Sequence, residues 1–160
     1  MEKIIVVLCI AVIIGFLTGI LLSGKVIAMA VKEHNQCVKK VVKYYFILND
    51  WLALRQKGET IAKFFEKNKY KRVAVYGMKE LGERLIDELE KNGIEVTCII
   101  DQNPTQKTGK IPVISPTDEI PKSDVMVVTA SFYFNEIRNR MKDRVDCDIV
   151  SMDDVVYSKY

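Results

Sequence analysis

The sequence lacks any charged residue between Ile4 and Leu22. A helix of nineteen residues, rising about 1.5 Å per residue, spans roughly the 30 Å hydrocarbon core of a bilayer. Residues 4–22 are therefore predicted to cross the membrane bilayer, which excludes a small enzyme that diffuses freely in the cytosol. Glycine (8) and proline (4) are scarce among the 160 residues, and 49% of the residues are hydrophobic. That composition excludes a collagen-like or disordered chain.

Residues that bind metals or perform catalysis are also few. The chain has one histidine, His34, and four cysteines, no two of which have the C-x-x-C spacing. We therefore expect no zinc site. The sequence contains no G-x-S-x-G motif and no histidine after residue 34. We identify no catalytic residues, so an enzymatic role is not indicated.

Positive charge is concentrated next to the apolar segment. Five lysines and one acid lie between residues 25 and 43, whereas residues 44–160 carry 18 basic and 19 acidic side chains. This bias predicts a single-pass protein of the cell membrane with its C-terminal part in the cytoplasm. The basic excess lies outside the globular part, so we expect no nucleic-acid partner. The alternative is a cleaved signal peptide, for which Ala28-Met29-Ala30 would supply the cleavage site.

The sequence predicts how the N-terminal helix pairs and where it ends. Gly15 and Gly19 form a G-x-x-x-G motif, which lets helix backbones approach closely and predicts a homo-oligomer through these two residues. Beyond the span, apolar residues recur with helical spacing, and Gly58 is expected to end the helix. These apolar residues are Val38, Val41, Val42, Tyr45, Leu48 and Leu52. We also expect most aromatic residues of segment 44–51 to pack in a core.

The predicted organisation has three parts: a transmembrane anchor (1–24), a juxtamembrane basic helix (25–57) and a domain with its leading helix (58–160). Within the domain, short apolar runs alternate with amphipathic segments. Strands are expected at 72–76, 95–100, 111–114, 124–130 and 148–152, and helices at 60–68, 79–92 and 135–143. This alternation predicts an α/β fold with an open, mostly parallel sheet and helices on both faces. The leading helices form a stalk or a cap.

A glycine turn after the first strand is the main functional signal. Gly77-Met78-Lys79 leads into a helix that contains Gly82. The start of a helix presents backbone N–H groups to a phosphate, and Asp101, at the end of the next strand, is placed to bind a ribose diol. Lys79 stands where the dinucleotide fingerprint has its second glycine. Its side chain either blocks the approach of a pyrophosphate or offers an ammonium group to a phosphate.

Two hydroxyl residues, Thr129 and Ser131, lie at the carboxyl end of the third long strand. They are candidates for hydrogen bonding to a phosphate or sugar, and the alternative is that they cap the next helix. Asp101 has a comparable alternative as a turn residue. The candidate binding residues are therefore Gly77, Met78, Lys79, Gly82, Asp101, Thr129 and Ser131.

Several of these pieces together resemble a known type of domain. Residues 45–157 resemble a Rossmann-like domain of bacterial surface-polysaccharide biosynthesis proteins. The resemblance rests mainly on Trp51-Leu-Ala-Leu, Ile61-Ala-Lys-Phe-Phe65, Val75-Tyr-Gly-Met, Leu81-Gly82, Ile100-Asp101 and Ile111-Pro-Val-Ile-Ser-Pro116. It implies an open Rossmann-like sheet with a crevice at the strand ends for NAD(P) or a nucleotide-sugar. Relatives of this type usually have glycine at the position of Lys79.

Two functions follow from the resemblance and the residues. The first is a membrane-tethered cytoplasmic domain that binds a nucleotide, dinucleotide or nucleotide-sugar and serves surface polysaccharide biosynthesis beside a glycan-assembly enzyme. The second is a non-catalytic interaction module that has lost ligand binding and docks a partner enzyme. A nucleotide that clashes with Lys79 would favour the second function, and an open crevice beside Asp101 and Ser131 would favour the first.

Overall fold

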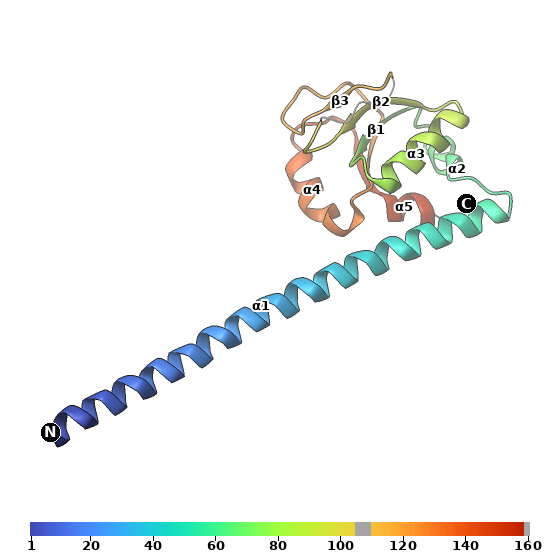
Figure 1. Ribbon diagram of the computed structural model, residues 1–160. Helices are drawn as coiled ribbons and strands as arrows, with labels where there is room; N and C mark the ends of the chain where they lie inside the picture. Colours follow the sequence, from blue (N-terminus) through green and yellow to red (C-terminus); the bar gives the residue numbers. More distant parts are fainter. Residues whose placement is uncertain (105–109, 159–160) are drawn as a thin grey trace. The chain divides into compact units, whose positions relative to one another are not determined.

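The computed structural model describes residues 1–104 and 110–158, without the side chains of residues 2–13, 17 and 21. The chain divides into two compact units, residues 1–42 and 43–160. Residues 43–56, which we predicted as part of the juxtamembrane helix, lie in the second unit. Figure 1 shows the elements, which are α1 (Glu2–Gln56), α2 (Ala62–Lys67), β1 (Arg72–Tyr76), α3 (Glu80–Lys91), β2 (Glu95–Ile100), β3 (Val113–Ile114), β4 (Val125–Val128), η1 (Ser131–Tyr133), α4 (Phe134–Met141), β5 (Asp148–Ser151) and α5 (Met152–Tyr157).

The first unit is the N-terminal part of α1. From Ile14 onward the helix has a stretch with a mean hydropathy of 1.9, none of which is buried inside the structure. By length and composition, the described residues therefore include one candidate membrane span, near the N-terminus, and a signal sequence or a core helix of a soluble protein has the same properties. Most of the predicted span, residues 4–22, lies outside the described side chains. The pairing through Gly15 and Gly19 stays a prediction.

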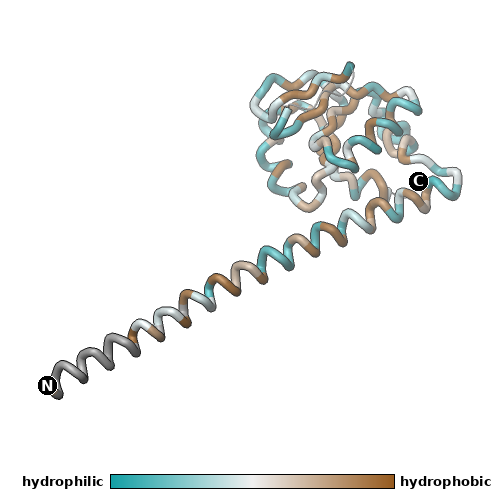
Figure 2. Tube along the Cα trace, in the orientation of Figure 1, coloured by the Kyte–Doolittle hydropathy of each residue, from teal (hydrophilic) through white to brown (hydrophobic). Residues whose placement is uncertain are grey.

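The second unit contains a five-stranded, all-parallel sheet in the order β3-β2-β1-β4-β5. The predicted α/β fold is therefore confirmed. The chain adds β2 and β3 on one side of β1 and then crosses to add β4 and β5 on the other side. The strand order thus reverses between β1 and β4, and in open sheets of this kind ligands bind at this switch point, outside the carboxyl ends of the strands. Both strands are almost completely buried. Figure 2 shows by colour that hydrophobic residues are frequent in the interior of the α/β unit.

Helices cover both faces of the sheet. On one face, α2, α3, α5 and the last part of α1 pack around Val73, Val75 and Val127. On the other face, α4 contributes Ile137 and Met141 to a smaller core. The last part of α1 is therefore part of the hydrophobic core on the first face of the sheet.

Helix α5 is absent from the sequence prediction. Ser151 begins it with a capping box, in which the Asp154 amide donates to Ser151 Oγ (3.1 Å) and the Ser151 amide donates to Asp154 Oδ2 (2.9 Å). Helix α5 buries Met152, Val155 and Val156. The S-x-x-D spacing of residues 151–154 is the signal that indicates this helix.

The apolar side chains of α1 in the second unit point in two directions. Ile47 and Trp51 are buried (0% and 5% exposed), whereas Tyr45 and Leu52 are 62% and 58% exposed. Within this unit, the residues with the predicted helical spacing, Tyr45, Leu48 and Leu52, therefore lie on the side away from the core. The expectation that most aromatic residues here are buried is wrong for Tyr45 and Phe46, because those two side chains lie on the outer side of the helix.

Candidate functional site

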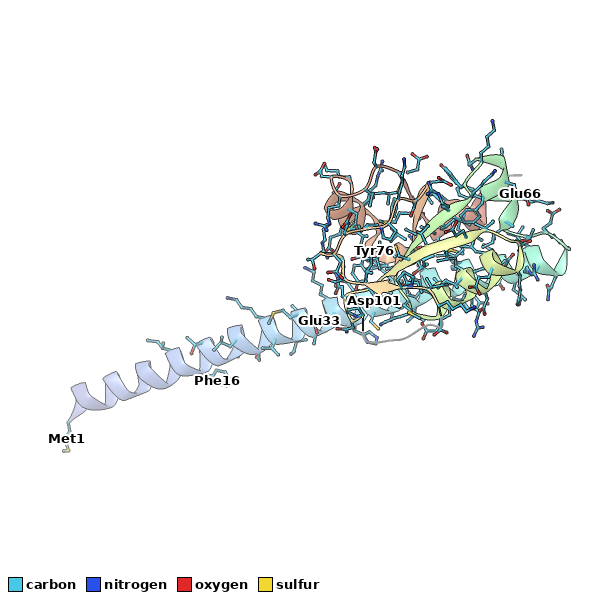
Figure 3. The ribbon with its side chains drawn as sticks, turned by 90° about the horizontal axis from the view of Figure 1, so that it is seen from above. Met1, Phe16, Glu33, Glu66, Tyr76 and Asp101 are labelled. Carbon is cyan, nitrogen blue, oxygen red and sulfur yellow. The ribbon has the colours of Figure 1, made fainter. Side chains whose placement is uncertain are left out.

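The carboxyl ends of β1, β2 and β4 meet at one edge of the sheet and bring predicted binding residues together. Figure 3 labels Tyr76, the last residue of β1, near Asp101, which follows β2. Gly77 follows β1, Asp101 follows β2 and Thr129 follows β4. Direct hydrogen bonds join these three segments. Sequence reasoning therefore predicted correctly which segments meet at this edge.

The glycines of the turn have structural roles. Gly77 has φ +97°, a conformation that L side chains rarely adopt, and its amide donates to the Ile100 carbonyl (2.9 Å). At position 82, a Cβ atom would lie 2.1 Å from the Gly77 carbonyl oxygen. Only glycine at position 82 allows the first turn of α3 to pack this closely on the β1 turn.

Thr129 connects β4 to the same turn. Its side chain is buried, and Oγ1 lies 3.0 Å from the Tyr76 carbonyl oxygen and 2.9 Å from that of Gly77. A hydroxyl group has one hydrogen to donate. That hydrogen therefore serves the backbone carbonyls of the β1 end, and the predicted ligand contact would have to use the remaining acceptor capacity of the oxygen.

Asp101 holds the glycine turn from the β2 side. Its Oδ2 accepts from the Met78 amide (3.0 Å), and its Oδ1 accepts from the Asn103 amide (2.9 Å). The second bond is the Asx-type turn of the alternative interpretation. The carboxylate predicted for a ribose diol therefore fixes two loops of the chain.

The start of α3 carries charges of both signs. Lys79 is the N-cap residue, is exposed, and makes no side-chain capping bond. Glu80 and Glu83 lie in the first turn, where their carboxylates stabilise the positive end of the helix. The Met78 side chain before them is 4% exposed and packs in the core. One exposed lysine and two acidic residues thus lie at the position predicted for a phosphate.

Lys43 of α1 reaches the same edge, a contact that sequence reasoning missed. Its Nζ donates to the Ser131 carbonyl (3.1 Å) and lies 3.1 Å from Asp153 Oδ2. Burial raises the pKa of the neighbouring Tyr44 side chain, and the nearby Glu80 and Asp153 carboxylates contribute to the increase. Sequence analysis used Lys43 only as one of the five lysines that predict the membrane orientation, and its charge alone does not indicate a contact with the β4 end.

Ser131 itself is 2% exposed. Within the described residues, its Oγ and the hydroxyl of Tyr76 are buried without a hydrogen-bond partner. Such groups are uncommon in folded proteins. Ser131 is therefore a predicted site residue whose buried hydroxyl has no hydrogen-bond partner among the described residues.

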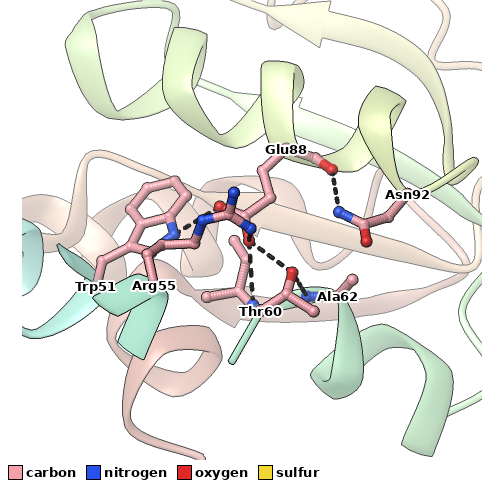
Figure 4. Close-up of polar contacts among 7 residues, drawn as sticks. Trp51, Arg55, Thr60, Ala62, Glu88 and Asn92 are labelled. Carbon is pink, nitrogen blue, oxygen red and sulfur yellow. Dashed lines mark hydrogen bonds and ion pairs between the residues drawn. The ribbon is translucent and has the colours of Figure 1, made fainter. Parts of the chain in front are cut away.

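A second polar cluster lies between α1 and α3 (Figure 4). Glu88 of α3 is 8% exposed and accepts from Trp51 Nε1 (2.8 Å), Thr60 Oγ1 (2.6 Å) and the Ile61 amide (3.3 Å). Arg55 approaches the same carboxylate at 3.5 Å. Glu88 therefore fastens α1 and the start of α2 to the sheet domain. Its place among the buried residues of α3, between Leu85 and Leu89, is the sequence signal for this role.

Two grooves lie away from the carboxyl ends of the strands. One of about 270 Å³ lies between α1 and α3, and one of about 670 Å³ is lined by Ala74, Ile120, Arg144 and Cys147, among others. Burial, followed by nearby acids, raises the pKa of Cys147 to about 11, so this thiol is protonated near neutral pH. The described part of the chain contains no group of three or more His, Cys, Asp or Glu residues that could hold a metal ion.

Comparison with known proteins returned one result. The family described as C2185-like, N-terminal matches residues 69–151. No curated protein and no solved structure matches the chain. The matched range includes all five strands and all seven candidate binding residues, and it leaves α1, α2 and α5 outside.

Proposed function

The chain belongs to the C2185-like, N-terminal family, and we propose that it is a membrane-tethered, non-catalytic interaction module that docks a partner enzyme in the cytoplasm. The observation that carries this proposal is the use of the strand-end polar groups by the chain itself. Asp101 binds the amides of Met78 and Asn103, and Thr129 binds the carbonyls of the β1 end. These are the groups that a nucleotide would need.

Charge at the edge supports the same proposal. Glu80 and Glu83 occupy the first turn of α3, and Lys79 replaces the glycine over which a pyrophosphate would pass. Two carboxylates near the helix start repel a phosphate and already stabilise the helix end. The Lys43 bond to Ser131 further ties the β4 end to α1. These charges and this contact favour a domain whose fold is retained in order to bind a partner protein.

The cellular setting rests on two arguments. The lysines that follow the apolar segment favour a cytoplasmic α/β unit and a single-pass anchor. The resemblance to domains of surface-polysaccharide proteins suggests a glycan-assembly enzyme as the partner. A membrane anchor would raise the effective concentration of the module beside such an enzyme.

Ser131 and Lys79 favour a second candidate function, the binding of a nucleotide or nucleotide-sugar. The Ser131 hydroxyl is buried without a partner among the described residues, and it follows β4 at the switch point. Lys79 is exposed at the start of α3. Each Asp101 oxygen also keeps a second lone pair that can accept from a ribose hydroxyl.

A thermal-shift screen of the full chain in detergent separates the two functions. NAD(H), NADP(H), nucleotide-sugars and coenzyme A are added to the wild type and to the Lys79→Gly and Asp101→Ala variants. A ligand at 100 times its Kd stabilises a protein by about 2.7 kcal/mol, which is readily visible. We expect no stabilisation of the wild type by any of them.

The control for the loss of one negative charge is Glu136→Ala, because Glu136 is exposed on α4 and pairs with Arg140. Binding that appears only in Lys79→Gly would show that the lysine closes the crevice, and would support the interaction module. Stabilisation of the wild type that Asp101→Ala removes and Glu136→Ala keeps would establish nucleotide binding and refute our proposal.

A further inference from the structure

An exposed apolar stripe runs along the outer side of α1 in the second unit. Tyr45, Leu48 and Leu52 are 62%, 41% and 58% exposed, although the opposite side of the same helix is buried in the core. Each large apolar side chain left in water forgoes a gain of about 25 cal/mol per Å² of surface. Contiguous exposed apolar residues of this kind mark interaction surfaces.

The spacing of the stripe indicates what covers it. Tyr45, Leu48 and Leu52 are three and four residues apart, and the sequence continues this alternation upstream. The upstream positions are Ile27, Val31, His34, Val38 and Val41, all of which are exposed in the first unit. In heptad notation, residues 31, 38, 45 and 52 are a positions, and residues 27, 34, 41 and 48 are d positions. Seven of these eight positions are apolar, the exception being His34 at a d position, and apolar a and d positions over more than three heptads indicate a coiled coil.

Charge favours a second copy of this chain as the partner. In this register Lys25, Lys32 and Lys39 occupy b positions, Lys40 is at c and Lys43 is at f, all away from an a/d seam. The flanking e and g positions between residues 28 and 51 carry no charged residue. Two copies of this face therefore meet without repulsion between like charges.

We propose that α1 pairs with α1 of a second copy as a parallel coiled coil through the a and d positions from Ile27 to Leu52. Two copies anchored in one membrane enter the cytoplasm in the same direction, which makes the pairing parallel. The groove of about 270 Å³ beside Leu48 and Leu52, bordered by Arg84 and Asp87 of α3, offers space for side chains of the partner helix. This inference goes beyond the proposed function, and only the parallel direction of the pairing rests on the membrane anchor of that proposal.

Disulfide cross-linking of the full chain in membranes tests the pairing. Cys9 and Cys37 are first replaced by serine, because Cys37 is exposed and lies at a g position beside the seam. A cysteine is then placed at Val38, an a position, or at Lys39, the neighbouring b position. We expect oxidation to give several-fold more covalent dimer with Val38→Cys than with Lys39→Cys. Equal cross-linking at the two positions would overturn the proposal.

A matched pair of substitutions tests the same surface by placing a negative charge either in the seam or beside it. Tyr45 (a) and Phe46 (b) are adjacent, aromatic and exposed. Tyr45→Glu would place an unpaired charge in the seam, so we expect it to lower the cross-linking of Val38→Cys at least about tenfold. Phe46→Glu, at a b position outside the seam, should leave the cross-linking nearly unchanged. Circular dichroism confirms that both variants fold. Equal effects of the two substitutions, or dimers that depend on Gly15 and Gly19 alone, would refute the coiled coil.

Discussion

Gly82→Ala should destabilise the α/β unit by about 3 kcal/mol, the upper part of the usual range for overpacking. The added Cβ would lie 2.1 Å from the Gly77 carbonyl oxygen, which is backbone and cannot rotate away. Gly77 is itself held by the bond of its amide to Ile100 and by Thr129 Oγ1. The first turn of α3 must therefore move away from β1, and urea unfolding of the full chain in detergent measures the cost.

Helix propensity makes this result informative. Alanine is better than glycine in a helix by about 1 kcal/mol, so propensity alone predicts that Gly82→Ala is stabilising. The control is Gly93→Ala, where the space is open but φ is +71°, and a loss of about 1–2 kcal/mol is expected from backbone conformation. A Gly82→Ala variant that is more stable than the wild type would refute the close approach of α3 to the β1 turn.

Glu88→Ala should have an effect of similar size, about 3 kcal/mol, by a different mechanism. The substitution removes the acceptor of the Trp51 indole N–H, the Thr60 hydroxyl and the Ile61 amide. A buried donor without an acceptor costs about 1–3 kcal/mol, and the three losses are not additive. We expect the last part of α1 to loosen from α3.

Trp51 is the one tryptophan of the chain, so its fluorescence reports this loosening during urea unfolding. The matched control is Glu90→Ala, two residues along the same helix, where the side chain is exposed. An exposed site of this kind should change the free energy of unfolding by about 0.5 kcal/mol or less. Equal losses for Glu88→Ala and Glu90→Ala would show that Glu88 does not fasten α1.

The sequence predicted the sheet domain well because local signals there agree. The strand from Arg72 to Tyr76 and the strand from Glu95 to Ile100 were predicted with the bounds that the structure has. Both are apolar runs bounded by turn residues, and the glycine turn at Gly77 separates the first from a strongly amphipathic helix. Helix α5 was missed because its six residues are too few to show a periodic pattern.

Helix α1 shows what periodicity leaves open. An apolar stripe predicts that one side of a helix is covered, but it does not identify the covering surface. Here the residues with coiled-coil spacing are exposed, and the neighbouring Ile47 and Trp51 are buried in the α/β unit. A helix with two apolar faces has no single stripe that sequence analysis can assign to the core.

The candidate site was located by its sequence but not explained by it. Gly77, Asp101 and Thr129 meet because each follows a parallel strand, which the strand pattern predicts. The partners of Asp101 are the backbone amides of Met78 and Asn103, and every residue except proline has such a group. No motif can therefore reveal whether a carboxylate at this position binds a ribose or its own backbone.

Hydrogen exchange of the Met78 and Asn103 amides, measured by NMR on the full chain in detergent, tests the central claim that Asp101 serves the fold. In the wild type we predict that both amides exchange slowly, because Asp101 accepts from each. Asp101→Ala should speed their exchange, and saturating NADH or a nucleotide-sugar should leave the wild-type rates unchanged. Fast exchange in the free wild type that slows when a nucleotide is added would contradict the account.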